Sequence, residues 1–289
     1  MKFLTIIISI FFLSLCSHAR SIEDIQAAGE IVIAVYNDFP PYSYVDSNGE
    51  AKGIDIEIGK RIAESLNVKP KWYFTDAGED MDGDLRNVVW KGNPVHKTRA
   101  DVMMRIPYDY NYMRETDAST GTLRTDMVVI KSPYHSERWV IVTHKETIPS
   151  INTMGIFAYN TVGVELDTLP DKYLSMHNGG LLRKNVKRYA RFQDAVKDFQ
   201  DGKIDAIAGL QSQLEFLLDY EKNQDKYFMT KEILGIKSKW DLGIAVRMDA
   251  HELSNHIDGV ISQLYQDNTL KSIFDQYHVT YNIPISISP

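Results

Sequence analysis

The pattern of apolar and polar positions is clearest near the start of the chain. Ile31 to Val35 is an almost unbroken apolar run, which is typical of a strand covered on both faces of a parallel sheet. Pro40 and Pro41 follow, and two consecutive prolines fix the backbone and remove two amide donors. We therefore predict that the chain leaves the sheet at Phe39 and continues as a stiff loop rich in tyrosine and phenylalanine.

A helix is predicted directly after this loop. Isoleucine or leucine recurs at every fourth position from Ile54 to Leu66, which forms one apolar stripe along a helix. Asp55, just after Gly53, is predicted to cap its first turn. Strand, loop and helix together form a β-loop-α unit. In open α/β sheets ligands lie beyond the carboxyl ends of the strands, which is where the aromatic loop is expected.

The rest of the first half contains more strands and a long irregular segment. Lys69 to Phe74 and Asp101 to Ile106 are predicted strands, and Pro107 is predicted to end the second. The aromatic and polar segment from Tyr108 to Arg124 has no period, so we expect an excursion at the rim of a site. Two separate extended runs are predicted on either side of Ser132 to Tyr134.

The second half repeats this arrangement. Thr161 to Val164, Val186 to Tyr189 and Ile204 to Ala208 are predicted strands, with predicted helices after the first two of them. A long helix is predicted after Gly209. Tandem strand-helix units imply an α/β fold of two doubly wound lobes whose strand ends face each other.

The segment from Met1 to Ala19 is predicted to be a cleaved signal peptide. Lys2 is followed by an apolar run too short to span a bilayer, and small residues stand before the predicted cleavage site. Cys16 raises the alternative of a lipoprotein, but the Leu15 before it is bulkier than a lipidation site requires. Because Cys16 is the only cysteine, the mature chain would contain no disulfide.

Composition and charge exclude several classes of function. The chain has a formal net charge of -7, which makes it a poor candidate for binding nucleic acid or an anionic membrane.

His251 and His256 resemble a zinc-binding pair but are five residues apart, so they point in different directions on one helix. The acidic segment from Asp80 to Asp84 could bind a cation or line the cleft entrance, but a solvated acidic loop is by far the simpler explanation. No cofactor, metal site or catalytic motif is predicted.

The motifs of the first unit resemble a known family. The order of strand, F-P-P-Y-S-Y, D-x-x-G and G-I-D-I-E-I-G-K-R-I-A-E-S-L is similar to the opening of the family 3 extracellular solute-binding proteins. Ser-Pro-Tyr at 132–134 also resembles a motif of this family. The resemblance implies a periplasmic-binding-protein-like, type II fold with a hinge of two crossings. It places lobe 1 at 22–139 and 244–289 and lobe 2 at 140–243.

The resemblance also implies where a ligand would bind, although both amino-acid signals are altered. Arg105 and Tyr108 stand where the family has small hydroxyl residues, and Leu210 stands where an aspartate would hold the ammonium group. The usual carboxylate-binding arginine is missing, although Arg114 or Arg124 could replace it. We therefore expect an organic acid or another small polar solute in preference to a zwitterion. The expected ligand-binding residues are Tyr36, Phe39, Arg105, Tyr108, Thr168 and Gln211.

Each of these residues also has an ordinary structural explanation, as a core residue, a surface ion pair or a helix cap. The resemblance implies a periplasmic, monomeric receptor that delivers its solute to the membrane permease of an ABC importer and has no enzymatic activity. Two alternatives remain. One is an accessory or sensory protein of a periplasmic oxidation system. The other is an enzyme similar to cyclohexadienyl dehydratases, with Glu165 or Asp167 as its general acid.

Overall fold

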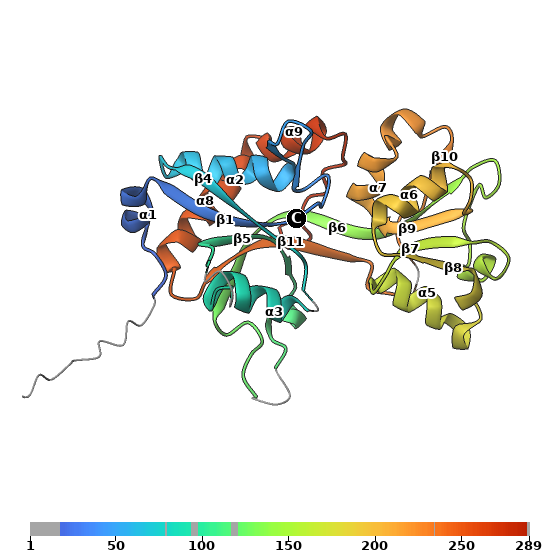
Figure 1. Cartoon of the computed structure of the whole chain (residues 1–289), viewed down its shortest axis with the longest axis horizontal. Helices are drawn as coiled ribbons and strands as arrows, with labels where there is room; N and C mark the ends of the chain where they lie inside the picture. Colours follow the sequence, from blue (N-terminus) through green and yellow to red (C-terminus); the bar gives the residue numbers. More distant parts are fainter. Residues whose placement is uncertain (1–17, 79, 94–97, 117–120, 234, 288–289) are drawn as a thin grey trace, which may run out of the picture.

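The computed structural model describes residues 18–78, 80–93, 98–116, 121–233 and 235–287. The predicted signal segment, including Cys16, lies outside the described residues up to position 17. The chain folds into two lobes joined by a narrow connection, as Figure 1 shows. Among the residues described, no helix combines the length and the apolar character that crossing a membrane requires.

The secondary structure alternates strands with helices in both lobes. The strands are β1 (Glu30–Tyr36), β2 (Tyr44–Val45), β3 (Ala51–Lys52), β4 (Lys69–Thr75), β5 (Val102–Tyr108), β6 (Val128–His144), β7 (Val162–Glu165), β8 (Val186–Tyr189), β9 (Ala206–Leu210), β10 (Tyr227–Met229) and β11 (Lys239–Arg247). The helices are α1 (Ile22–Ala28), α2 (Ile54–Ser65), α3 (Met81–Leu85), α4 (Tyr110–Met113), α5 (Leu169–Gly180), α6 (Phe192–Gln200), α7 (Gln211–Leu217), α8 (His251–Gln266) and α9 (Thr269–Gln276). A π-helical turn at Arg86–Trp90 and 3₁₀ turns at Met154–Ala158, Arg183–Asn185 and Tyr220–Asn223 complete the list.

One sheet runs through both lobes in the order β4-β1-β5-β11-β6-β9-β7-β8, with β10 beside β6. In lobe 1, β1 lies between β4 and β5 and is parallel to both; in lobe 2, β7 lies between β8 and β9 in the same way. This repetition confirms the two doubly wound lobes. β6 and β11 pass between the lobes as an antiparallel pair.

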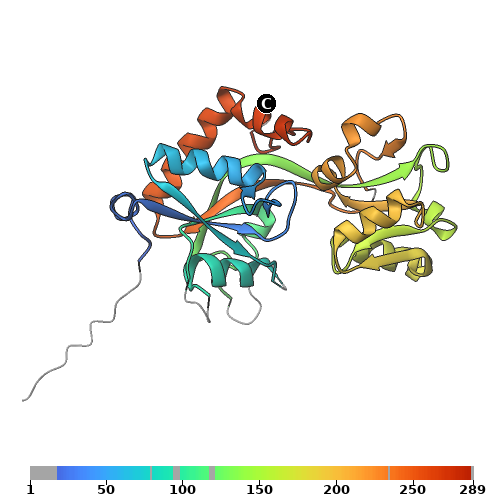
Figure 2. The same cartoon turned by 45° about the horizontal axis from the view of Figure 1, so that its top comes forward.

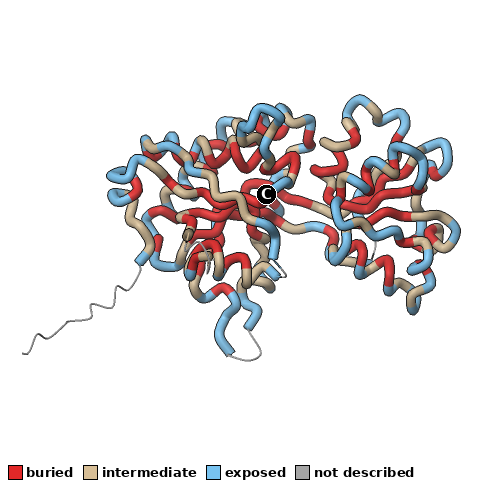
Figure 3. Tube along the Cα trace, in the orientation of Figure 1, coloured by how far each residue is buried: buried red, intermediate tan, exposed pale blue. Residues whose placement is uncertain are grey.

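Each lobe has its own apolar core on both faces of its part of the sheet. In lobe 1, α2, α8 and α9 cover one face, and α3 with the π turn after it covers the other. In lobe 2, α6 and α7 cover one face and α5 covers the other. Figure 3 shows buried strands inside both lobes, with exposed loops around them. The lobe bounds at 22–139, 244–289 and 140–243 stay a prediction.

Several predicted elements differ from the structure. The two runs around Ser132 to Tyr134 form one continuous strand, β6, and β5 continues through Pro107 to Tyr108. Pro107 lies near the end of β5, opposite Leu242 of β11 and beyond the part of β5, Val102 and Met103, that pairs with β1, and a strand tolerates proline best at such a position. The acidic segment contains a short helix, α3, and the predicted long helix after Gly209 has only seven residues.

Asp55 does not cap α2. Gly53 occupies the cap position with φ 129°, and a Cβ there would lie 2.1 Å from the carbonyl oxygen of Tyr42. Only glycine fits this approach of two backbones. Asp55 therefore lies within the first helical turn, where it is completely buried.

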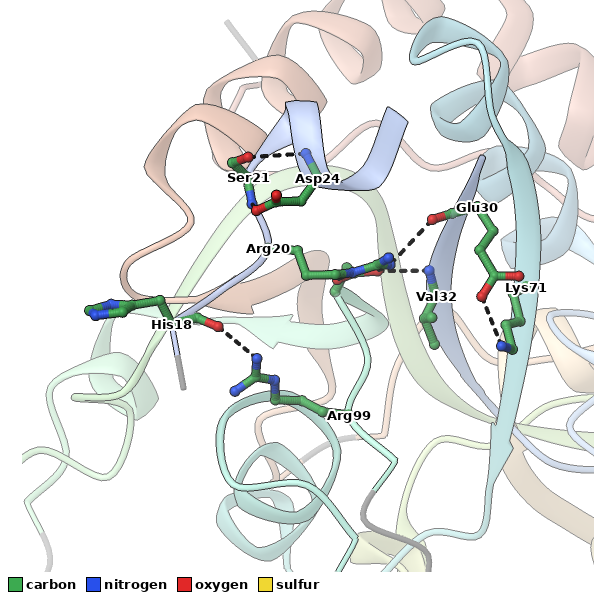
Figure 4. Close-up of polar contacts among 9 residues, drawn as sticks. His18, Arg20, Ser21, Asp24, Glu30, Val32, Lys71 and Arg99 are labelled. Atoms are coloured by element: carbon green, nitrogen blue, oxygen red, sulfur yellow. Dashed lines mark hydrogen bonds and ion pairs between the residues drawn. The ribbon is translucent and has the colours of Figure 1, made fainter. Parts of the chain in front are cut away.

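The residues just before α1 are tied to lobe 1 at the end away from the hinge. The Nε of Arg20 donates to one carboxylate oxygen of Asp101 at 2.8 Å, and its Nη2 pairs with the other oxygen. That second oxygen also accepts a hydrogen bond from the amide of Val32 at 2.8 Å. Arg99 donates to the carbonyl of His18 at 2.7 Å, as Figure 4 shows. These bonds attach the beginning of the folded chain to β1 and to the residue before β5.

Candidate functional site

The carboxyl ends of the parallel strands of both lobes point toward the hinge. β6 runs from lobe 1 into lobe 2, and β9 is antiparallel to it and ends at Leu210, opposite Trp139. β11 runs back into lobe 1, and β5 is antiparallel to it and ends at Tyr108, opposite Asp241. Because β1 and β7 are parallel to β5 and β9, their ends face each other as well. Figure 2 shows the two lobes on either side of this interlobe region.

The aromatic loop after β1 lies on the lobe 1 side of this region. The Tyr36 hydroxyl donates to Asp84 of α3 at 2.9 Å. Burial, with the Asp84 carboxylate beside it, raises the pKa of Tyr36. Phe39 is half-buried, and its ring centroid lies 6.3 Å from those of both Tyr36 and Tyr42. The amide of Phe39 donates to the carbonyl of Ser43 at 2.7 Å, which closes the loop on itself.

Arg105 lies directly behind this loop. Its guanidinium carbon is 4.7 Å from the centre of the Phe39 ring and 3.7 Å from that of Tyr42, so it is stacked between two aromatic rings. The side chain is 7% exposed, and its Nη2 lies 3.6 Å from Glu137. The Nη1 atom is buried with no hydrogen-bond partner among the described residues. Burial opposes the charge of Arg105, but Tyr42, Glu137 and Asp55 together raise its pKa.

Glu137 joins Arg105 to both lobes. It is completely buried on β6, and its Oε2 accepts a hydrogen bond from Tyr42 at 2.8 Å and another from the hydroxyl of Ser212 on α7. We call Tyr42, Arg105, Glu137 and Ser212 the hinge cluster. A carboxylate on a crossing strand thus binds a loop of lobe 1 and a helix of lobe 2. Sequence reasoning missed Glu137, although a lone acid in an extended run near Ser132 to Tyr134 was a usable signal.

Asp55 and His135 are buried next to the hinge cluster. The Tyr134 hydroxyl donates to Asp55 at 2.8 Å, and the other Asp55 oxygen has no partner among the described residues. Burial raises the pKa of Asp55 to about 7, although Arg105 and Tyr134 oppose the shift. His135 stacks on Phe274 with ring centroids 4.4 Å apart, and burial lowers the pKa of His135 to about 4.

The other three predicted residues lie apart from Arg105. Tyr108 is half-buried at the end of β5. Thr168 caps α5, and its hydroxyl donates to the carbonyl of Glu165 at 2.7 Å. Gln211 begins α7 and donates to Glu215 at 2.6 Å. The structure therefore brings together Tyr36, Phe39 and Arg105. Tyr108 packs against the same apolar cluster as Tyr36 and Phe39, whereas no hydrogen bond or ring contact in the described part of the chain joins Thr168 or Gln211 to them.

A C-terminal segment adds a further connection at the hinge. The amide and the hydroxyl of Thr280 donate to Glu215 of α7 at 2.7 and 2.9 Å. Asn282 accepts a hydrogen bond from Arg138 on β6 at 3.0 Å. Two backbone amides of the segment donate to the buried Asp241 of β11, both at 2.8 Å. Lobe 2 is thus held to lobe 1 by more than its two crossing strands.

The acidic segment near the site is accounted for by contacts within the protein. Asp80 caps α3, Asp82 accepts from Tyr112 at 3.1 Å and from Arg124 at 3.0 Å, and Asp84 holds Tyr36. Among the residues described, no group of three or more histidine, cysteine or acidic side chains is placed to hold a metal ion.

Comparisons with known proteins agree with this architecture. The family model of bacterial extracellular solute-binding proteins, family 3, matches residues 31–114. The arginine-binding periplasmic protein of Mannheimia haemolytica is 21% identical over 259 residues, which is 88% of this chain and 93% of that protein. The L-cystine-binding protein of Escherichia coli is also 21% identical over 259 residues, with coverage of 89% and 85%.

Solved structures extend the comparison to the fold. An ancestral cationic amino acid solute-binding protein matches with a TM-score of 0.68 at 19% identity, over 89% of this chain and 99% of that one. An amino acid ABC transporter substrate-binding protein of Streptococcus pneumoniae, bound to L-arginine, matches with a TM-score of 0.63 at 19% identity, over 91% and 100%. The fold is that of a type II periplasmic binding protein. Residues 31–114 of the chain are thus similar to the family 3 bacterial extracellular solute-binding proteins.

Proposed function

We propose that this protein is a periplasmic solute-binding protein that captures a small polar solute between its lobes and delivers it to the permease of an ABC importer. One observation carries the proposal: the carboxyl ends of both sets of parallel strands face each other across a hinge of two strands. A solute that contacts both lobes favours closure only through contacts that the open state lacks. The protein would act as a monomer, after removal of Met1 to Ala19.

We place the solute against Tyr36 and Phe39 on lobe 1, with Tyr108 beside them and Thr168 and Gln211 on lobe 2. Arg105 would reach a carboxylate through its Nη1, which is buried with no hydrogen-bond partner among the described residues, once the nearby Phe39 ring moves. Glu137 balances the charge of Arg105. An organic acid or an amino acid with an accessible carboxylate therefore suits this site, and two of the named relatives bind the amino acids arginine and L-cystine.

A second candidate function is enzymatic. Glu165 is the last residue of β7, at the interlobe region, and burial raises its pKa, as a general acid requires. One similar structure is described as a precursor of cyclohexadienyl dehydratase. The acid of the hinge cluster, Glu137, is already occupied by Tyr42 and Ser212, so it offers Glu165 no second catalytic group. We therefore prefer binding to catalysis.

The proposal predicts a ligand-dependent gain in thermal stability. The mature chain, from Arg20, is melted against amino acids and small carboxylic acids in turn. A solute present at about a hundred times its dissociation constant should stabilise the folded state by about 2.7 kcal/mol, which raises the melting temperature by roughly 5–10 °C. Phe39→Ala should weaken this shift, because it removes the ring that the solute contacts.

Tyr159→Ala serves as the matched control, because Tyr159 is a fully exposed aromatic residue of lobe 2, 91% exposed. An equal loss of the shift in both variants would contradict the placement of the solute at Phe39. Consumption of the stabilising compound would favour the enzyme. No shift with any compound would favour the accessory-protein alternative.

A further inference from the structure

The outer edge of lobe 2 carries a positive charge that the whole-chain composition conceals. Residues 183–191, with the sequence RKNVKRYAR, contain five basic side chains and no acidic one, although the chain as a whole has 32 basic and 39 acidic residues. The segment includes β8, which ends the sheet order of lobe 2. All five basic residues are exposed. Figure 1 shows β8 and α5 together at the end of the molecule opposite α1.

Most of this charge is not neutralised within the protein. Arg188 pairs with Asp171 at 2.6 Å and Arg191 with Asp194 at 3.3 Å. Arg183, Lys184 and Lys187 have no ion-pair partner in the described parts of the chain. The edge of lobe 2 therefore keeps a net positive charge.

Exposed apolar side chains lie next to this charge. Met176 and Leu181, at the end of α5 and just after it, are 69% and 57% exposed, and Leu166 before the helix is 48% exposed. A groove of about 560 Å³ is lined by Leu166 and Met176, by the basic side chains of Lys172, Arg183 and Arg188, and by Asp167 and Asp171, of which Asp171 is paired with Arg188. Leu166, Met176, Arg183 and Arg188 thus share one face, which we call the α5–β8 face. Lys187 points to the opposite side of the sheet, like Tyr189, which packs against the core under α6.

We propose that the α5–β8 face docks on the surface of a bilayer that contains anionic lipid. At physiological salt the Debye length is about 8 Å. The attraction between anionic headgroups and the cations of this face is therefore screened less than the repulsion from acidic residues farther away. Each Lys or Arg near an anionic surface adds roughly fivefold to the affinity. The protruding Met176 and Leu181 would enter the headgroup layer beside the cations. The net negative charge of the chain therefore does not exclude this contact.

The opposite edge of the sheet shows that edge protection alone does not explain this face. Edge strands commonly carry lysines that prevent pairing with other strands. β4, the edge strand of lobe 1, has Lys69 and Lys71, and Lys71 is paired with Glu30 at 2.8 Å. No large apolar residue of β4 is exposed.

A folded acidic partner would need a complementary surface of about 800 Å², whereas single protruding side chains suit a bilayer.

Sedimentation with vesicles tests the proposal. The mature chain is mixed with vesicles of phosphatidylcholine alone or with three parts in ten of phosphatidylglycerol. We expect binding to the anionic vesicles that is lost at high salt. Arg183→Glu combined with Lys184→Glu should lower the affinity tenfold or more, and Leu166→Ser combined with Met176→Ser should lower it at low salt. Lys69→Glu combined with Lys71→Glu makes the same charge change on the opposite edge and should have little effect.

Four results would overturn the proposal: no binding to either vesicle, equal binding to both, binding that resists salt, or an equal loss from the charge reversals on β4 and at Arg183 and Lys184. Binding of an acidic polypeptide such as polyglutamate, without binding of vesicles, would assign the face to a protein partner instead. Melting of each variant confirms that it is folded. The assay requires no solute, so its result is independent of the proposed solute-binding function.

Discussion

Replacing Glu137 by alanine should lower the free energy of unfolding by about 3–5 kcal/mol, because the change leaves the buried cation of Arg105 without its counter-charge. The same change removes the acceptor of the hydrogen bonds from Tyr42 and Ser212, and both donors are buried. Leaving a buried donor unpaired is more costly than never having formed the bond. Urea denaturation of the mature chain, followed by circular dichroism, measures the difference.

Two further variants make this prediction specific. Glu50→Ala removes an exposed carboxylate that pairs with Lys52, and it should change the stability little. Combining Glu137→Ala with Arg105→Met should be less destabilising than the sum of the two single changes, since the double variant buries no unpaired charge. If Glu137→Ala costs no more than Glu50→Ala, or if the two changes add, the hinge cluster does not hold the lobes as described.

Asp55 and His135 should give the protein two opposing pH dependences. Asp55 has a pKa of about 7 in the folded state against 3.8 as a reference, so the folded state retains its proton longer and stability falls as the pH rises from about 4 to 7. His135 has a pKa of about 4 against 6.5, so the unfolded state gains a proton first and stability falls as the pH drops from 6.5 to 4. Each effect is on the order of 3–4 kcal/mol.

Single substitutions separate these two effects. With Asp55→Asn, stability should rise between pH 4 and pH 6.5, because only the His135 effect remains. With His135→Gln, stability should fall between pH 4 and pH 7, because only the Asp55 effect remains. His251→Gln changes an exposed histidine and controls for the substitution itself. Denaturation curves at four pH values would contradict the account if both variants kept the pH profile of the unchanged chain.

The sequence was most informative where local pattern and burial coincide. Ile31 to Val35 and the stripe from Ile54 to Leu66 lie where predicted, since continuous apolar runs and a four-residue period each correspond to one kind of buried surface. The second lobe followed from the same signals. The repeated strand-helix units were therefore sufficient to predict two doubly wound lobes.

Elements that depend on distant partners could not be predicted in this way. β6 is continuous through Pro133 because β11 pairs with it on both sides of that residue. Asp55 looked like a cap because nothing nearby in the sequence shows that Gly53 must pack on Tyr42. In each case a contact from elsewhere in the chain overrides the local preference.

The candidate site was predicted only in part, for the same reason. Tyr36, Phe39 and Arg105 come together because the ends of β1 and β5 are neighbours, which the β-loop-α pattern implies. Glu137 could not be assigned, because its partners Tyr42 and Ser212 are 95 and 75 residues away in the sequence. A buried charge pair across a hinge leaves no periodic signal in the sequence.

Small-angle X-ray scattering tests the central claim most directly. The mature chain is measured alone and with the solute that raises its melting temperature, and Phe39→Ala is measured under the same conditions. Capture of the solute between the lobes predicts that the radius of gyration decreases when it binds, and that Phe39→Ala needs a higher concentration for the same decrease. A solute that binds and stabilises the protein while the radius of gyration stays unchanged would contradict capture by closure of the lobes.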